Sequence, residues 1–274
     1  MTRLAMPEEK SIYYKADDVV IFNQLARKIP MDAVSNQEYY AWLDRMKSEV
    51  GRRVAGAEIA EKPHAREAPP LNTAIYYDTP DRRILPTGAL LRTSCNKITH
   101  AFCAFKMAED DCSVRKDHRY VFEGDEKLAI QQAPASRSAV HIVQRLMART
   151  DMEHPGTFLE RHYGVDPTTL SPSIRLDSLR YTFFGWLDRR DALRCSIDRY
   201  ETVDFRVPCG SRARVTVTEV ELAIYPRISP EVARDPRVVA LISYLSDSLC
   251  STFNTAVTTD IKYQRCARAL QISY

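Results

Sequence analysis

The sequence predicts an α+β fold whose centre is a closed antiparallel β barrel with helical elaborations. Short segments rich in β-branched and aromatic residues recur between residues 73 and 225, and turn residues separate them. Segments with helical periodicity lie between and after these strands, and the chain contains no internal repeat. A sheet of many antiparallel strands commonly removes its exposed edges by closing into a barrel.

The first quarter of the chain is predicted to contain one strand and two helices. The strand is expected over about 6–15, and a helix capped by aspartate is expected over about 17–28. Apolar side chains recur on one helical face over 36–50, which predicts the second helix. Residues 51–71 are charged, contain prolines and have no period, so we expect an exposed excursion there.

Two groups of strands are expected to enclose a helical insert at about 126–168. The first group covers residues 73–78, 89–95, 101–107 and 118–123. The second group covers residues 176–185, 192–199, 202–207 and 213–225. A C-terminal helical segment at about 229–254 carries a row of Val, Leu and Ile residues, and the whole of 1–274 is expected to form a single domain.

Composition excludes several classes of protein. The chain has 39 Lys and Arg against 36 Asp and Glu, and this near balance does not indicate nucleic-acid binding. No apolar run reaches the roughly 18 residues of a membrane span, and residues 1–10 lack an export signal. The seven cysteines form no CxxC pair, which indicates reduced thiols in a cytoplasmic protein and argues against zinc. Neither a P-loop nor a GxGxxG motif is present.

The most specific motif is the hairpin Thr73–Arg92, which turns at Asp78-Thr-Pro-Asp and contains Pro86-Thr-Gly before its second strand. These twenty residues resemble the YFDTPDxxLxxxGxALRxR signature of the CYTH proteins. This is the adenylate cyclase and thiamine triphosphatase superfamily, also called triphosphate tunnel metalloenzymes. A chance hairpin has no need for the Asp-Thr-Pro-Asp turn, the glycine and the final arginine in this register.

Charged residues also recur at even spacings on the expected strands, so that they share a face. Each pair taken alone is equally explained by the solvated face of a half-buried strand. The pairs are Glu8 with Lys10, Arg194 with Asp198, and Glu219 with Glu221.

The CYTH resemblance implies that these residues line an eight-stranded antiparallel tunnel. Basic residues would hold a triphosphate chain, and acidic residues would hold Mg²⁺ or Mn²⁺, a hard cation that suits carboxylate oxygens. The implied phosphate ligands are Lys10, Arg92, Lys106, Arg119 and Arg194. The implied metal ligands are Glu8, Asp198, Glu219 and Glu221, and the implied catalytic residues are Glu8, Lys10, Glu219 and Glu221.

Three positions depart from the CYTH pattern. Met6 replaces the first glutamate of the ExExK strand, and Ser94 replaces the second arginine of the hairpin. Val121 replaces the first glutamate of RxExE. These neutral residues weaken the prediction of two-metal hydrolysis but leave phosphate binding intact.

A second resemblance is to the VTC domain, the polyphosphate-polymerase branch of the same superfamily. Residues 170–180 and 193–198 resemble its LxPxxxxxYxR…RxSxD stretch, which implies that Arg180 contacts phosphate. Residues 260–265 resemble its late SK[YF] element, with isoleucine in place of the serine, and Lys262 becomes a further phosphate ligand. Lys262 is equally explained as a solvated charge of a C-terminal tail.

The expected function is metal-dependent hydrolysis of an inorganic or nucleoside triphosphate. Phosphoryl transfer needs chiefly positioning and charge stabilisation, which a charged tunnel supplies. The same tunnel suits two other reactions, VTC-like polyphosphate polymerisation and class IV-type nucleotidyl cyclisation. A non-catalytic polyphosphate or nucleotide sensor is the alternative of a different class, because a tunnel that loses carboxylates still binds anions. Neither a membrane nor a nucleic acid is an expected partner, and the oligomeric state is left open.

Overall fold

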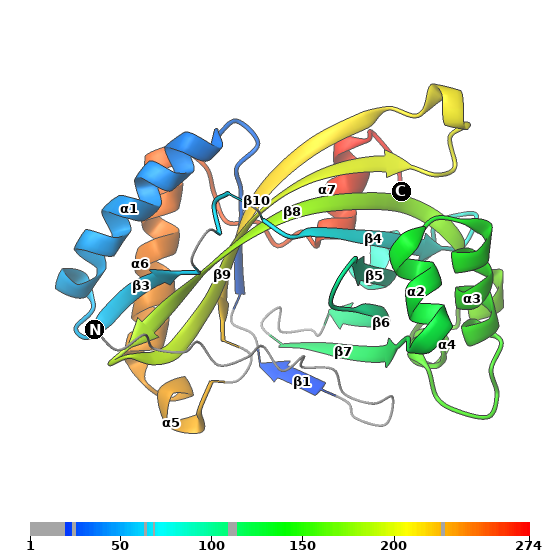
Figure 1. The fold of residues 1–274 in the computed structure, drawn as a ribbon, viewed down its shortest axis with the longest axis horizontal. Coiled ribbons are helices and arrows are strands. Elements are labelled where there is room, and N and C mark those ends of the chain that lie inside the picture. Colours follow the sequence, from blue (N-terminus) through cyan, green and yellow to red (C-terminus); the bar gives the residue numbers. More distant parts are fainter. Residues whose placement is uncertain (1–19, 24–25, 63–64, 68, 109–113, 226–227) are drawn as a thin grey trace.

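The structure is a computed structural model that describes the chain apart from residues 1–19, 24–25, 63–64, 68, 109–113 and 226–227. Its main element is one antiparallel sheet of ten described strands, with helices packed against it (Figure 1). The predicted α+β fold with a large antiparallel sheet is therefore confirmed. No helix among the described residues is long and apolar enough to cross a membrane.

The strands are listed here in chain order: β1 (Val20–Asn23), β2 (Ala26–Pro30), β3 (Ala57–Glu61), β4 (Leu71–Asp78), β5 (Leu90–Asn96), β6 (Ala101–Ala108), β7 (Val114–Val121), β8 (Ser171–Leu187), β9 (Arg190–Asp204) and β10 (Arg214–Ile224). Their order in the sheet is β1-β7-β6-β5-β4-β8-β9-β10-β2, and β3 pairs with β8. Among the described strands, the sheet is open between its edges, β1 and β2. These two strands are consecutive in the chain, with only residues 24–25 between them, so a tunnel-like arrangement results.

Two segments differ from the sequence prediction near the N-terminus. The helix expected over 17–28 is wrong, because β1 and β2 lie there, paired with β7 and β10. The β-branched and aromatic run of β1 favours a strand, and pairing with β10 stabilises β2 despite its charged residues. The excursion expected over 51–71 contains β3, which pairs with the end of β8. The strand expected over 6–15 lies outside the described residues.

The helices are α1 (Asn36–Arg53), α2 (Gly124–Gln132), α3 (Arg137–Met147), α4 (Pro155–Tyr163), α5 (Pro230–Ala233), α6 (Pro236–Phe253) and α7 (Lys262–Ala269). A capping box starts α1, in which the Ser35 side chain accepts from the Glu38 N–H and Glu38 accepts from the Ser35 N–H. Helices α2 to α4 occupy the expected insert, and α5 and α6 occupy the expected C-terminal segment. Helix α7 was not predicted.

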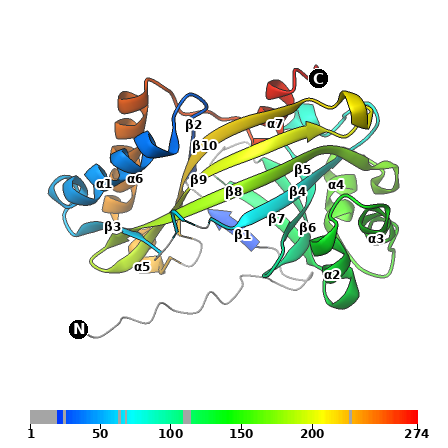
Figure 2. The same ribbon diagram turned by 45° about the horizontal axis from the view of Figure 1, so that its top comes forward.

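Hydrophobic clusters cover both faces of the sheet. Helices α1 and α6 pack at one end of the outer face, against residues such as Phe183 and Val220. Helices α2 to α4 pack at its other end, against residues such as Ile75 and Phe105 (Figures 1 and 2). The opposite side, which we call the inner face, carries a third cluster in which Tyr263 and other side chains of α7 pack against β4, β8, β9 and β10. A helix from the C-terminus therefore lies against the inner face.

Candidate functional site

The pairing register places the described site residues on the inner face. Residues directly opposite in an antiparallel pair project to the same side, so the face is followed from strand to strand. On one side of the sheet, Glu219 lies opposite Asp198, and Asp198 lies opposite Arg180. The remaining inner-face pairs are Glu221 with Lys28, Arg194 with Ala223, Tyr76 with Arg92, Ala104 with Arg92 and Arg119, and Leu90 with Lys106.

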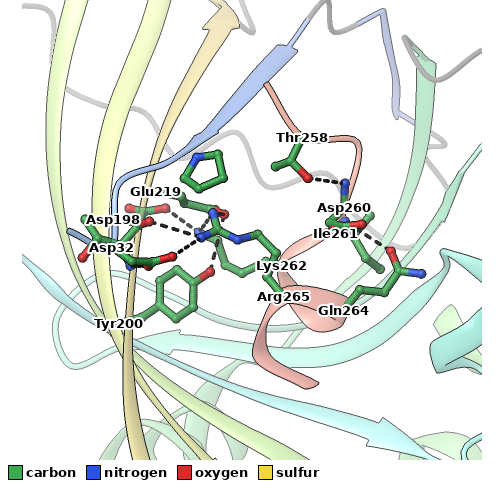
Figure 3. A network of polar contacts seen from close by, with 12 residues as sticks. Asp32, Asp198, Tyr200, Glu219, Thr258, Asp260, Ile261, Lys262, Gln264 and Arg265 are labelled. Carbon is green, nitrogen blue, oxygen red and sulfur yellow. Dashed lines mark hydrogen bonds and ion pairs between the residues drawn. The ribbon is translucent and has the colours of Figure 1, made fainter. Parts of the chain in front are cut away.

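Asp198, Glu219 and Glu221 form an acidic cluster at the centre of β9 and β10. Asp198 and Glu219 are fully buried. Arg180 binds Asp198 with two hydrogen bonds, in which Nε and Nη2 each donate to one carboxylate oxygen at 2.7 Å. The Lys262 Nζ of α7 lies 2.5 Å from Asp198 Oδ2 and 2.9 Å from Glu219 Oε1 (Figure 3). Lys262 therefore bridges the two buried carboxylates.

Arg265, one turn further along α7, completes the contacts of Glu219. Its Nη1 donates to Glu219 Oε2 at 3.0 Å, and its Nη2 lies 3.2 Å from Asp32 Oδ2 (Figure 3). The Tyr200 hydroxyl also donates to Glu219 Oε2, at 3.4 Å. Both oxygens of Glu219 thus face a cation contributed by α7.

The hairpin motif positions α7. The Asp78 carboxylate, which is fully buried, accepts from the backbone N–H groups of Thr79, Ile84 and Leu85. It also accepts from the Tyr263 hydroxyl of α7 at 2.8 Å. The Tyr263 ring stacks on Tyr76, with 4.7 Å between centroids. The first aspartate of the motif therefore holds both the turn and the C-terminal helix.

The neighbouring cations lower the pKa of two carboxyls of the acidic cluster, Asp198 and Glu221. Burial raises the pKa of the Asp198 carboxyl, but the Arg180 and Lys262 charges outweigh burial and hold this pKa well below its usual range. Burial likewise raises the pKa of Glu221, and the charges of Lys28, Lys262 and Arg180 outweigh it and lower the pKa to about 2. For Lys262 the carboxylates outweigh burial and raise the pKa. The cluster is therefore a charged network whose members compensate one another.

A second group of charges lies beside His100, at the turn between β5 and β6. Burial, followed by the positive charges of Arg92, Arg119 and Arg180, lowers the pKa of His100 to about 4. The Arg119 guanidinium also lies over the Phe102 ring, 4.9 Å from its centroid. We call Arg92, Arg119 and Arg180 the guanidinium cluster. Its three arginines come from three strands, and their positive charges help to lower the pKa of the neighbouring His100.

Two buried polar groups, one in this cluster and one beside it, lack hydrogen-bond partners in the part of the chain that the structure describes. Among the described residues, neither Arg92 Nε nor the Tyr76 hydroxyl has a partner. Tyr76 is fully buried and lies directly opposite Arg92 on β4 and β5. Burial raises the Tyr76 pKa to about 12, so the hydroxyl keeps its proton and remains a donor. A buried donor without an acceptor costs about 1–3 kcal/mol, so this part of the inner face is suited to an acceptor from outside the chain.

The acidic cluster as it stands does not fit a divalent metal. A hard cation needs several carboxylate oxygens turned toward one point. Both oxygens of Asp198 and both of Glu219 instead face Arg180, Lys262 or Arg265. Within the described ranges, no three His, Cys, Asp or Glu side chains are grouped so as to hold a metal. Glu8 and Lys10, two residues predicted for the site, lie outside those ranges.

Several placements were not foreseen from the sequence. Lys28 is buried on β2 opposite Glu221, in a segment expected to be helical. Only the β-branched run of β1 just before it signalled a strand. Lys262, a predicted phosphate ligand, contacts two carboxylates, which the sequence did not indicate. Lys106 and Arg194 are half-buried on the inner face, and the departures Ser94 and Val121 also lie on that face.

Comparisons with known proteins give distant structural similarities. No protein-family model and no curated protein matches the sequence. The fold resembles a candidate adenylate cyclase from Bacillus halodurans, with 13% identity, a TM-score of 0.48, and coverage of 89% of this chain and 98% of that chain. It also resembles HpAC1 from Hippeastrum, a candidate adenylyl cyclase described as having a dominant triphosphatase activity, with 12% identity, a TM-score of 0.48, and coverage of 88% and 95%. Similarities at this level assign no activity to the chain.

Proposed function

We propose that the inner face binds a linear anion with several phosphate groups, such as inorganic triphosphate or the triphosphate of a nucleotide. The observation that carries the proposal is the pair of buried donors without partners, Arg92 Nε and the Tyr76 hydroxyl, beside the guanidinium cluster. A phosphate oxygen accepts hydrogen bonds from both donors at once. Its negative charge also offsets the positive charges that lower the pKa of His100.

The spacing of the arginines favours a chain of phosphates over a single one. Arg92 on β5 and Arg119 on β7 are separated by one strand, since both lie opposite Ala104 of β6. Two strand spacings amount to about 10 Å, more than one phosphate group spans. Arg180 approaches from β8, on the other side of β4. In this proposal Lys106 and Arg194 extend the binding face and contact further phosphates. Lys10, which lies outside the described residues, stays a prediction from the sequence.

Calorimetric titration with tripolyphosphate in EDTA tests the proposal. We expect wild-type protein to bind, and Arg92→Met to bind about 10- to 100-fold more weakly, since a charge-assisted hydrogen bond to a buried group is lost. Arg199→Met is the matched control. Arg199 is exposed on β9 and lies next to Asp198, so its side chain projects to the outer face. Equal affinities of wild type and Arg92→Met would contradict the proposal.

Hydrolysis of the bound triphosphate is a second candidate, in keeping with the sequence prediction. Its support is that Asp198, Glu219 and Glu221 lie on the same face as the guanidinium cluster. Incubation with tripolyphosphate or ATP, with Mg²⁺ or Mn²⁺ and resolution of all products, distinguishes the outcomes. Orthophosphate would indicate a hydrolase, cyclic nucleotide a cyclase and longer polyphosphate a polymerase. The absence of every product, together with binding, would indicate a sensor.

A further inference from the structure

We infer that the cations of α7 take the place of a divalent metal in the acidic cluster, so that the inner face binds its phosphate anion without metal. The inference rests on the proposed anion binding. It adds that cations of the chain itself, and not a metal ion, neutralise the buried carboxylates. Lys262 Nζ stands between Asp198 and Glu219, at 2.5 Å and 2.9 Å from their oxygens. That is the position from which one cation contacts both carboxylates, which lie directly opposite each other on β9 and β10.

Counted over the part of the chain that the structure describes, the charges of the cluster balance without any added ion. Its three carboxylates, together with Asp32, are matched by the four cations Arg180, Lys262, Arg265 and Lys28. A metal entering between Asp198 and Glu219 would displace the Lys262 ammonium and leave it without its carboxylate partners in the interior. An uncompensated buried charge is strongly unfavourable, so the arrangement excludes the metal.

Helix α7 packs against the inner face through buried side chains, so moving it away from the carboxylates is unfavourable. Ile261, Tyr263, Cys266 and Ala267 are buried in the cluster on the inner face. Tyr263 is further held by the hydrogen bond to Asp78 and by its stack on Tyr76. Removing Lys262 from the carboxylates by moving the helix would expose these apolar side chains and break the contacts to the hairpin motif. The α7 cations are therefore permanent parts of the site.

Substitution of Lys262 should reveal the metal site that it occupies. We propose titrating Mn²⁺, without phosphate, into wild type and Lys262→Met, and following bound metal by electron paramagnetic resonance. Wild type should show no binding at the acidic cluster, whereas Lys262→Met should bind Mn²⁺ at least ~10-fold more tightly, because two hard carboxylates lose their bridging cation. Lys262→Met combined with Asp198→Asn should lose that gain.

Arg268→Met is the matched control on the same helix. Arg268 pairs with Asp260 at the surface, where its side chain is 59% exposed. This variant should bind Mn²⁺ no better than wild type. A gain in Arg268→Met equal to that in Lys262→Met, or no gain in Lys262→Met, would overturn the inference.

Wild-type protein alone provides a second test if Lys262→Met does not fold. Tripolyphosphate should bind wild type in EDTA, and Mn²⁺ alone should not bind the acidic cluster. Anion binding that appears only when Mn²⁺ is present would overturn the inference while leaving the proposed function in place. No anion binding under either condition would instead overturn the proposed function, and the Mn²⁺ titration of wild type would still decide whether the cluster excludes metal.

Discussion

The acidic cluster and the guanidinium cluster share one face of the sheet but differ in how their polar groups are satisfied. In the acidic cluster, the oxygens of Asp198 and Glu219 face cations of the chain itself. In the guanidinium cluster, Arg92 Nε and the Tyr76 hydroxyl have no partner among the described residues. A charged pair that is satisfied internally stabilises the fold, whereas a buried donor left without a partner is a candidate for contact with a ligand.

The comparison predicts opposite signs for substitutions in the two clusters. Removing a charge from the acidic cluster should destabilise the protein, because its partners stay buried without compensation. Removing Arg92 from the guanidinium cluster should cost ligand affinity but no stability, whereas Arg180 is also the partner of Asp198 and belongs to the compensated network. The predictions below are ordered from the largest expected effect to the smallest.

Asp198→Asn should produce the largest effect, lowering the free energy of unfolding by about 3–5 kcal/mol, since Arg180 and Lys262 lose their shared buried partner. Urea denaturation measures it. The control is Asp151→Asn, whose partner is Arg149 and whose side chain is 68% exposed. Solvent screens that surface pair, so its loss should change the free energy of unfolding far less. Equal losses in the two variants would show that the acidic cluster is not a compensated network.

Arg92→Met should change stability in the opposite direction. The free protein should gain about 1 kcal/mol in its free energy of unfolding, because a buried donor without a partner is removed. Urea denaturation in the absence of phosphate measures this gain. With tripolyphosphate present the order should reverse, since only wild type is strongly stabilised by the ligand. A stability loss without ligand would place Arg92 in the structural network.

Tyr76→Phe should raise the stability of the free protein and weaken its binding of tripolyphosphate, although it removes only one oxygen atom. The substitution removes only the buried hydroxyl without a partner and keeps the ring that stacks on Tyr263. The free protein should be more stable by up to about 1 kcal/mol, and tripolyphosphate should bind about 3- to 10-fold more weakly. The pair of measurements is denaturation and calorimetric titration. A loss of stability together with unchanged affinity would contradict the assignment of the hydroxyl to the ligand.

His100 should report occupancy of the guanidinium cluster. Its pKa is about 4 in the folded protein, lowered by burial and by Arg92, Arg119 and Arg180. The pKa of His100 in the folded protein lies below its value of about 6.5 in the unfolded chain. The contribution of His100 to the free energy of unfolding is therefore complete above pH 6.5. It is lost as pH falls toward 4, because the unfolded chain binds the proton first.

Bound tripolyphosphate should raise the pKa of His100, because it offsets the charges that help to depress it. Titration of its ring protons by NMR, with and without ligand, measures the shift. His141, on α3, provides an internal reference because α3 packs against the outer face. An unchanged His100 titration in the presence of bound ligand would place the anion elsewhere on the protein.

The sequence by itself determined most of the sheet and the shared face of the charges. The hairpin Thr73–Arg92 and the strands on either side follow from turn residues and β propensity, which act over a few residues. Even spacing on a strand also determines that residues share a face, and the register brings Asp198, Glu219 and Arg180 together on it.

Only the tertiary structure decided what lies against that face. The contacts of α7 join residues far apart in the chain: Lys262 with Asp198 across 64 positions and Arg265 with Asp32 across 233. Period and propensity contain no information about such pairs, because a lysine in a short C-terminal helix has the same local pattern whether it is solvated or buried. The sequence did not predict that Lys28 lies in a strand, for the same reason. Pairing of β2 with β10 outweighs the local helical preference of its charged residues. The inner face gained its compensating cations through packing of the helix that carries them.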